Sequence, residues 1–230
     1  MKNPKKKNWS EFKAESSWRM FKIMSEFVDG FEKMEQFGPC ISIFGSARTK
    51  AGTPHYDLAV KIAEKLAKEG YGIITGGGPG IMEAGNKGAR NMKGRSVGLH
   101  IELGMEQDWN DFIDPEKLLI FKYFFARKVM FIRYAQAFVF MPGGFGTMDE
   151  VFEVLTLIQT KKIDPVPVIF VGKDYWQGLM DWIHETMLAK EKNINTKDLK
   201  LFEITDDPNR VVKIIDAFYK KQVLRPNMRL

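Results

Sequence analysis

Short apolar runs alternate with amphipathic segments along most of the chain. The runs at residues 40–44, 72–75, 96–101, 137–141 and 168–171 contain no lysine, arginine, aspartate or glutamate, and apolar residues recur every three or four positions between them. Uninterrupted apolar strands are typical of a parallel sheet that helices cover on both faces. We therefore predict an α/β fold, a Rossmann-like doubly wound parallel sheet with helices on both faces.

The pattern predicts one domain with a tail at each end. Residues 9–36 carry Phe21, Met24, Val28 and Phe31 at helical spacing, so they are expected to form a helix that packs on the domain or on a partner subunit. Residues 1–8 are a basic stretch that predicts a disordered tail, and residues 222–230 predict a second tail. The single Rossmann-like domain is expected to span residues 9–221.

The most informative stretch is residues 142–150, with the sequence PGGFGTMDE. An apolar run precedes it and a helical pattern follows, which predicts a glycine turn between a strand and the start of a helix near Thr147. Glycines let backbone N–H groups approach an anion, and a helix N-terminus adds unpaired donors, so phosphate is the expected ligand. Asp149 and Glu150 are less expected beside a phosphate, although the helix dipole also favours acidic residues in a first turn.

A second glycine turn, residues 76–80, follows the second predicted strand. It lacks the G-x-G-x-x-G spacing of NAD and FAD sites, and neither turn has the Gly-Lys-Ser/Thr of a P-loop. In a doubly wound sheet ligands bind beyond the carboxyl ends of the strands, where both turns are expected. We therefore predict a small-molecule site without a dinucleotide cofactor.

Two adjacent basic residues, Arg127 and Lys128, lie in a helical segment that is otherwise nearly all apolar. A buried arginine needs a partner, and a phosphate or the carboxylate of Glu150 would serve. The three histidines lack metal-ligand spacing, so no metal site is expected, and the single cysteine, Cys40, lacks the context of a nucleophile. Catalysis would have to depend on carboxylates and basic residues.

Composition and charge add limits on partners and location. The chain of 230 residues has a formal net charge of +6, much of it at the ends, and it shows no nucleic-acid-binding motif. Attraction of anionic substrates accounts for that charge. One cysteine fits a reducing compartment, and no run approaches the roughly twenty apolar residues of a membrane-spanning helix. We expect a cytoplasmic protein that binds neither nucleic acid nor membrane.

Residues 76–84, the Arg127-Lys128 pair and residues 142–150 together resemble the LONELY GUY family, and the flanking segments resemble its bacterial branch. The resemblance covers roughly residues 40–189. The family consists of cytokinin riboside 5′-monophosphate phosphoribohydrolases that were long labelled as possible lysine decarboxylases. The resemblance implies hydrolysis of the N-glycosidic bond of AMP, N6-prenylated AMP or both, giving the purine base and ribose 5-phosphate. It also implies a homodimer or higher homo-oligomer with the site near the subunit interface, and no cofactor.

The family's catalytic arginine and glutamate fall on Arg127 and Glu150. A carboxylate stabilises the oxocarbenium-like transition state of glycoside cleavage, and Arg127 would hold Glu150 ionised. The expected substrate-binding residues are Ser46, Gly77, Gly78, Gly80, Met82, Glu106, Lys128, Gly143, Gly144, Phe145, Gly146, Thr147 and Thr156.

Two alternatives stay open at the level of the sequence. The predicted fold also resembles molybdenum-cofactor carrier proteins, which would make the protein a non-catalytic binder of a nucleotide or of a phosphate-bearing pterin. Lysine decarboxylase activity is the other alternative, but the sequence shows no pattern that suggests a lysine bound to pyridoxal phosphate.

Overall fold

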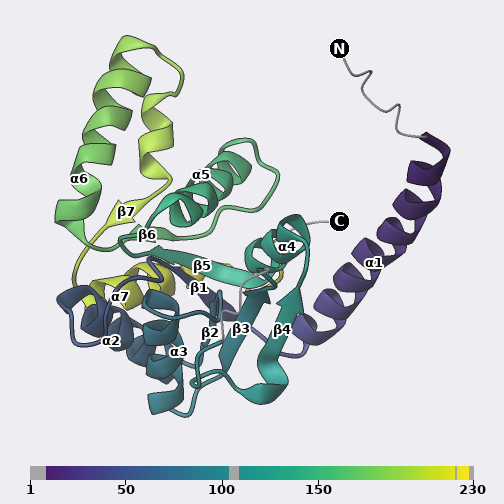
Figure 1. The fold of residues 1–230 in the computed structure, drawn as a ribbon. Helices are drawn as coiled ribbons and strands as arrows, with labels where there is room; N and C mark the ends of the chain where they lie inside the picture. Colours follow the sequence, from purple (N-terminus) through teal and green to yellow (C-terminus); the bar gives the residue numbers. More distant parts are fainter. Residues whose placement is uncertain (1–8, 104–108, 221, 228–230) are drawn as a thin grey trace, which may run out of the picture.

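The computed structural model in Figure 1 describes residues 9–103, 109–220 and 222–227, with side chains from Ser17 onward. Residues 1–8, for which a disordered tail is expected, lie outside the described residues. Among the helices described, none is both long and apolar enough to cross a membrane.

A seven-stranded parallel sheet forms the centre of the molecule. Its strands are β1 (Cys40–Phe44), β2 (Gly72–Thr75), β3 (Ser96–Ile101), β4 (Leu118–Phe121), β5 (Ala135–Phe140), β6 (Val168–Phe170) and β7 (Glu203–Ile204). They lie in the order β4-β3-β2-β1-β5-β6-β7, and each neighbouring pair is parallel. Ile41 of β1 pairs with Ile73 of β2 on one side and Ala137 of β5 on the other. The predicted doubly wound parallel fold is confirmed.

The strand order reverses beside β1. Strands β1 to β4 follow one another toward one edge of the sheet, and β5 to β7 continue from β1 toward the other edge. The connections on the two sides of such a reversal lie on opposite faces, which leaves a crevice at the carboxyl ends of the strands. The loops that follow β1, β2 and β5 therefore meet in one place.

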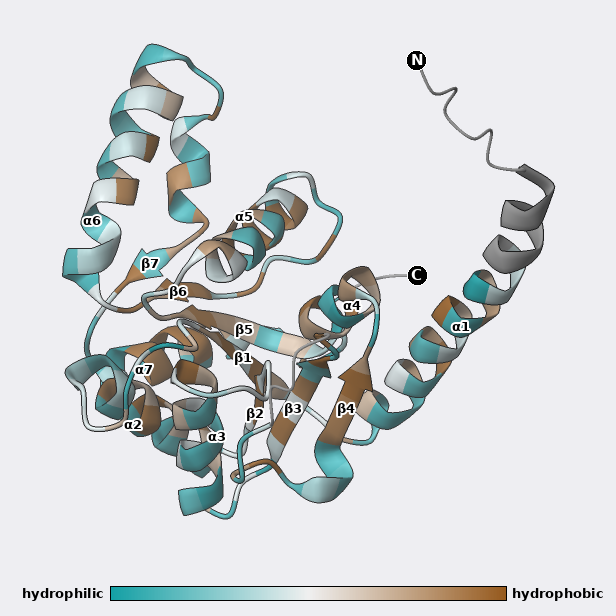
Figure 2. Ribbon diagram, in the orientation of Figure 1, coloured by the Kyte–Doolittle hydropathy of each residue, from teal (hydrophilic) through white to brown (hydrophobic). Residues whose placement is uncertain are grey.

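Helices cover both faces of the sheet (Figures 1 and 2). One layer contains α2 (Pro54–Lys68), α3 (Ile81–Asn91) and α7 (Pro208–Tyr219), and the other contains α4 (Phe124–Tyr134), α5 (Phe145–Gln159), α6 (Lys173–Trp182) and the end of α1 (Trp9–Glu35). The short helices are η1 (Pro115–Lys117), η2 (Ile183–Lys190) and η3 (Thr196–Lys200).

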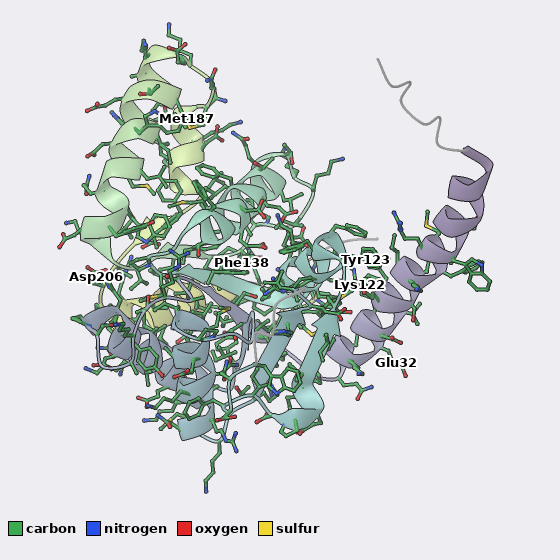
Figure 3. The ribbon with its side chains drawn as sticks, viewed as in Figure 1. Glu32, Lys122, Tyr123, Phe138, Met187 and Asp206 are labelled. Carbon is green, nitrogen blue, oxygen red and sulfur yellow. The ribbon has the colours of Figure 1, made fainter. Side chains whose placement is uncertain are left out.

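The central strands β1, β2, β5 and β6 contribute alternate side chains to two hydrophobic cores. In β5, Phe138 and Phe140 enter the core beneath α4 and α5, whereas Ala137 and Val139 enter the core beneath α2 and α7. This follows from the two-residue side-chain period of a strand, and it explains why the strand runs are apolar throughout. Figure 3 shows Phe138 in the middle of the molecule.

Among the described side chains of helix α1, those of its C-terminal half pack on the domain. Phe27 and Phe31 pack against the core that contains α4, and Met130 lies so close to Gly30 that a side chain there would meet its sulfur. Phe21 and Val28, from the predicted apolar stripe, are 60% and 61% exposed. The predicted packing on the domain is thus confirmed for only part of the helix.

Several boundaries differ from the predicted ones. Thr53 stands at the N-cap of α2, where its hydroxyl donates to the Lys50 carbonyl at 2.7 Å and makes no capping hydrogen bond to the helix. Helix α5 begins at Phe145, two residues before the expected start at Thr147, because extended Gly144 takes the N-cap position. In the C-terminal segment, Asn227 is buried, and its backbone N–H donates to the Arg133 carbonyl at 2.7 Å. Residues 222–227, expected to belong to a tail, are thus held against the domain.

Candidate active site

A cleft of about 790 Å³ opens where the loops after β1, β2 and β5 meet. The β1–α2 loop, the two glycine turns, the ends of β3 and the starts of α4, α5 and α6 form its walls. Its lining consists of residues 44–48, 76, 78, 82, 100, 101, 103, 124, 127, 143–150 and 175. This is the crevice that the reversal of strand order creates.

The glycine turn at the start of α5 forms one end of the cleft. A side chain at Gly143 would collide with Thr147, whereas side chains at Gly144 and Gly146 would meet no protein atom within 4 Å. The hydroxyl of Tyr175 donates to the Gly143 carbonyl at 2.5 Å, which fixes the turn from the side of α6. Open space above glycines at a helix N-terminus is suited to a phosphate group.

The glycine turn after β2 is shaped by close contacts and by left-handed backbone. Gly77 and Gly80 have φ values of +76° and +71°, which favour glycine. The side-chain amide of Asn110 donates to the carbonyls of Gly77 and Gly78, both at 3.0 Å. A side chain at Gly76 would collide with the guanidinium of Arg127.

Ser46, in the loop after β1, connects the two glycine turns. Its backbone N–H donates to the Pro142 carbonyl at 2.9 Å, and its carbonyl accepts from the Ile81 N–H at 3.0 Å. Its side-chain oxygen accepts from the Arg48 N–H at 3.1 Å. The predicted contact residue Ser46 therefore also holds the two halves of the cleft together.

Glu150 lies one turn into α5 and is only 7% exposed. Its Oε2 atom is buried and has no hydrogen-bond partner. Burial raises the pKa of Glu150 to about 7, and Lys128 and Arg127 only partly offset the effects of burial and of Glu153 and Asp149. A carboxylate with this pKa is able to exchange a proton near neutral pH, as a general acid or base must.

Arg127 extends from α4 toward the same region. Its Nε donates to the Leu99 carbonyl at 2.6 Å, and its guanidinium lies 5.2 Å from the centre of the Phe131 ring. Burial lowers the pKa of Arg127 to about 10 and Glu150 raises it, so the side chain is still charged at neutral pH. The Arg127 side chain thus contacts a backbone carbonyl and an aromatic ring. Arg127 and Glu150 both lie in the described part of the chain, and they form no ion pair within 4.0 Å. Arg127 favours the ionised form of Glu150, but burial has the larger and opposite effect, so the pKa of Glu150 stays above its usual value.

Lys128 and Asp149 pair with each other. The Lys128 Nζ atom lies 2.7 Å from Asp149 Oδ2 and 2.8 Å from Glu153 Oε2. Lys128, an expected substrate contact, therefore binds two carboxylates of α5 and does not line the cleft. Asp149 gains a structural role from this pair.

The structure brings most of the predicted residues together. The cleft is lined by Ser46, Gly78, Met82, Arg127, Gly143, Gly144, Phe145, Gly146, Thr147 and Glu150. Gly77 and Gly80 shape the turn after β2 without lining the cleft. Thr156 is exposed and lies beside a smaller cavity between α5 and η2. Glu106 lies outside the described residues.

Sequence reasoning missed four residues that line or support the cleft. His100, Tyr175 and Arg48 are part of its wall, and burial and the nearby charge of Arg127 lower the pKa of His100. Glu26 of α1 accepts the backbone N–H of Lys122 at 2.8 Å and of Tyr123 at 3.2 Å, just before α4. Figure 3 labels Lys122 and Tyr123 beside α1. His100 could have been identified from its position at the end of a predicted strand. No feature of the sequence indicated the role of Glu26.

Within the described parts of the chain, no group of three or more histidine, cysteine, aspartate or glutamate side chains is placed to hold a metal ion. The chemically distinctive group in the cleft is the buried carboxylate of Glu150, next to an anion-binding turn and a buried arginine. Such an arrangement can bind a phosphate ester and exchange a proton a short distance away.

Comparison with known proteins gives matches to one sequence family. The model of the family described as "Possible lysine decarboxylase" matches residues 82–215. The chain is 28% identical to a cytokinin riboside 5′-monophosphate phosphoribohydrolase of Mycobacterium marinum, over 56% of this chain and 69% of that protein. It is 24% identical to an enzyme of the same name from Arabidopsis thaliana, over 80% of this chain and 84% of that protein.

Among solved structures, the molybdenum cofactor carrier protein of Chlamydomonas reinhardtii has a similar fold. The TM-score is 0.58 at 19% identity, and the match covers 80% of this chain and 99% of that one. A likeness at this identity concerns the fold alone.

Proposed function

The chain belongs to the possible lysine decarboxylase family, and from that premise we propose that it is a hydrolase that cleaves the N-glycosidic bond of nucleoside 5′-monophosphates. The products are the free base and ribose 5-phosphate. The two relatives described above are named phosphoribohydrolases, a name that denotes this type of reaction. The observation that carries the proposal is the buried carboxylate of Glu150, whose Oε2 atom has no hydrogen-bond partner, one turn beyond the glycine turn at the start of α5.

In this proposal two parts of the α5 N-terminus have different roles, one at the phosphate and one at the ribose. The turn at residues 143–147 supplies backbone N–H groups and open space for the 5′-phosphate. Glu150, farther along the helix, then faces the ribose. As the bond between C1′ and the base nitrogen breaks, positive charge develops on the ribose, and a nearby carboxylate stabilises it.

Water completes the reaction in this proposal. Its oxygen forms the new bond to C1′, and Glu150 accepts the proton that the water loses. The departing base takes up a proton at the nitrogen that was bonded to C1′. Arg127 keeps a positive charge beside the cleft, where it contacts the ribose or the phosphate and opposes the cost of ionising Glu150.

The cleft also suggests the class of base. Its wall beyond Arg127 contains Met82, Ile101, Leu103 and Phe124, which offer an apolar surface to a planar ring. We propose AMP or N6-prenylated AMP as the substrate. This part of the proposal rests on the apolar wall and on the family, and a panel of nucleotides tests it directly.

We further propose that the protein is a homodimer. Trp18, Phe21 and Val28 of α1 are 72%, 60% and 61% exposed, and Phe125 of α4, which lies beside α1, is 49% exposed. A contiguous apolar surface of this kind is typical of an interface. Light scattering after size exclusion would give the mass of the particle and refute the proposal if it found a monomer.

The deciding experiment is incubation of the purified protein with a panel of nucleoside monophosphates, followed by chromatography of the free base and assay of ribose 5-phosphate. The wild type should release both in equal amounts. Glu150→Gln should abolish release while it still binds the nucleotide, and Glu116→Gln, at an exposed site on η1, should behave as the wild type. Binding of a phosphate-bearing pterin without any turnover of nucleotides would favour a carrier function.

A further inference from the structure

Lys128 lies at the centre of a charged cluster between α4 and α5. Its ammonium is within 2.8 Å of carboxylate oxygens of Asp149 and Glu153, and its side chain is 16% exposed. Asp149 directly precedes Glu150, and Glu153 lies three residues after it, so both flank the same turn of α5. The Lys128 charge is therefore held over the turn of α5 that carries Glu150.

The same contacts hold Lys128 away from the substrate. An ammonium group has three N–H donors, and two carboxylates of α5 already surround this one. Lys128 is absent from the lining of the cleft, whereas its neighbour Arg127 is part of it. Arg127 is thus available to a ligand in the cleft, whereas Lys128 is occupied by the carboxylates of α5.

We propose that Lys128 is a positioning residue that sets the charge state of Glu150 across the α4–α5 contact, without touching the nucleotide. Asp149 and Glu153 hold Lys128 in place and oppose its effect on Glu150. The inference rests on the proposed function for its catalytic consequence, but its electrostatic part concerns the protein alone.

The charged groups that face Glu150 come from both helices. Arg127 and Lys128 belong to α4, and Asp149 and Glu153 belong to α5; Arg48 and His100 line the other walls of the cleft. Among these neighbours Lys128 has the largest effect in lowering the pKa of Glu150, ahead of Arg127. Without Lys128, three carboxylates would share one turn of helix and each would disfavour ionisation of the others.

The consequence for catalysis follows from the direction of these effects. If the reaction needs ionised Glu150, loss of the Lys128 charge moves the acidic limb of the pH profile of kcat to higher pH. Loss of a carboxylate partner moves it to lower pH, because a repulsive charge disappears and Lys128 is released toward Glu150. Two substitutions in one ion pair therefore have opposite effects, which a contribution to stability alone would not produce.

The test combines a direct titration with kinetics. Carbon-13 NMR of glutamate carboxylates follows the titration of Glu150 without substrate, and the spectrum of Glu150→Gln assigns the signal. Lys128→Met should move the midpoint of the Glu150 titration upward by about one pH unit, and the acidic limb of the pH profile of kcat should move with it. Lys128→Arg should restore both to the wild-type values. Glu153→Gln should move both downward.

The control is a lysine with a similar environment elsewhere. Lys117 is 17% exposed and lies 3.0 Å from Asp114 and 2.6 Å from Glu116. Lys117→Met should leave the Glu150 titration and the pH profile unchanged.

Two results would overturn the proposal. One is an unchanged Glu150 midpoint in both Lys128→Met and Glu153→Gln. The other is a rise in the KM for nucleotide in Lys128→Met with an unmoved acidic limb, which would make Lys128 a substrate contact. The NMR titration decides the electrostatic claim even if the protein hydrolyses no nucleotide, so the failure of the proposed function is seen separately.

Discussion

The guanidinium of Arg127 occupies the space in which a side chain at Gly76 would lie. The two residues belong to different sides of the cleft, since Gly76 follows β2 and Arg127 extends from α4. The glycine thus gives the arginine room to reach the cleft while its Nε binds the Leu99 carbonyl at 2.6 Å. The placement of the Arg127 side chain depends on the absence of a side chain at Gly76.

This relationship predicts the effect of Gly76→Ala. The added methyl group should displace the guanidinium and lower kcat/KM by about a hundredfold, because small misplacements of catalytic groups have large costs. Steady-state kinetics measure the effect, and circular dichroism shows whether the fold persists. Full activity in a folded Gly76→Ala variant would mean that Arg127 does not need its observed position.

The raised pKa of Glu150 predicts how stability depends on pH. In the unfolded chain a glutamate loses its proton near pH 4.5, whereas folded Glu150 keeps it up to about pH 7. The folded state binds more protons in that interval, so Glu150 lowers the free energy of unfolding as the pH rises from 4.5 to 7. The full loss of free energy of unfolding from ionised Glu150 is present above pH 7 and absent below pH 4.5.

Glu150→Gln should therefore be more stable than the wild type at pH 8, by at most about 3 kcal/mol, and equally stable at pH 4. Urea unfolding at the two pH values measures the difference. A constant difference at both pH values would show that packing, rather than ionisation, distinguishes the two proteins.

Gly146 allows the phosphate site to be probed without disturbing the protein. A methyl group there would meet no protein atom within 4 Å, and alanine in place of glycine within a helix adds about 0.5–1 kcal/mol of stability. We expect Gly146→Ala to be slightly more stable and to have a several-fold higher KM for the nucleotide. Gly178→Ala, in the open part of α6, should gain stability with no change in KM.

The contact of Glu26 with the start of α4 predicts that the N-terminal helix supports catalysis. Tyr123 is the N-cap residue of α4, and the Glu26 carboxylate of α1 accepts its backbone N–H and that of Lys122, which fixes the chain just before the helix begins. Glu26→Ala should cost about 1 kcal/mol of stability and lower kcat, because Arg127 lies in the first turn of α4. Thermal unfolding and kinetics check both effects.

Glu32 is the matched control for Glu26. It is exposed on α1 and is labelled in Figure 3 near the C-terminal end of the helix. Glu32→Ala should leave both stability and kcat at the wild-type level. An equal loss in the two variants would show that any charge removed from α1 has the same effect, and would contradict a specific role for the contacts of Glu26 with Lys122 and Tyr123.

Much of the fold was predictable from the sequence, because apolar runs and glycine turns depend on local rules. A strand without charged residues has to be buried on both faces, and this alone predicts the parallel sheet. Residues 142–150 also contain their own signal, since a glycine turn between a strand and a helix predicts an anion site. Both features need only neighbouring residues to be recognised.

The features that could not be predicted are contacts between distant parts of the chain. Lys128 is an expected substrate contact, and in the structure its side chain pairs with Asp149 and Glu153, which are 21 and 25 positions away in sequence number. Glu26 acts on a helix about a hundred residues later. No periodicity or motif records such pairs, because they depend on how helices pack on the sheet.

The bridge formed by Ser46 has a thermodynamic consequence. One peptide group binds the strand end that precedes the 142–147 turn and the next binds the first residue of α3, so neither glycine turn is able to shift without straining the other. When one product binds and orders one turn, the other turn should also lose conformational freedom. Binding of the second product should then cost less conformational entropy. We expect ribose 5-phosphate and free base to bind with positive cooperativity, each slowing the departure of the other. Release of the two products would then be ordered in time rather than independent.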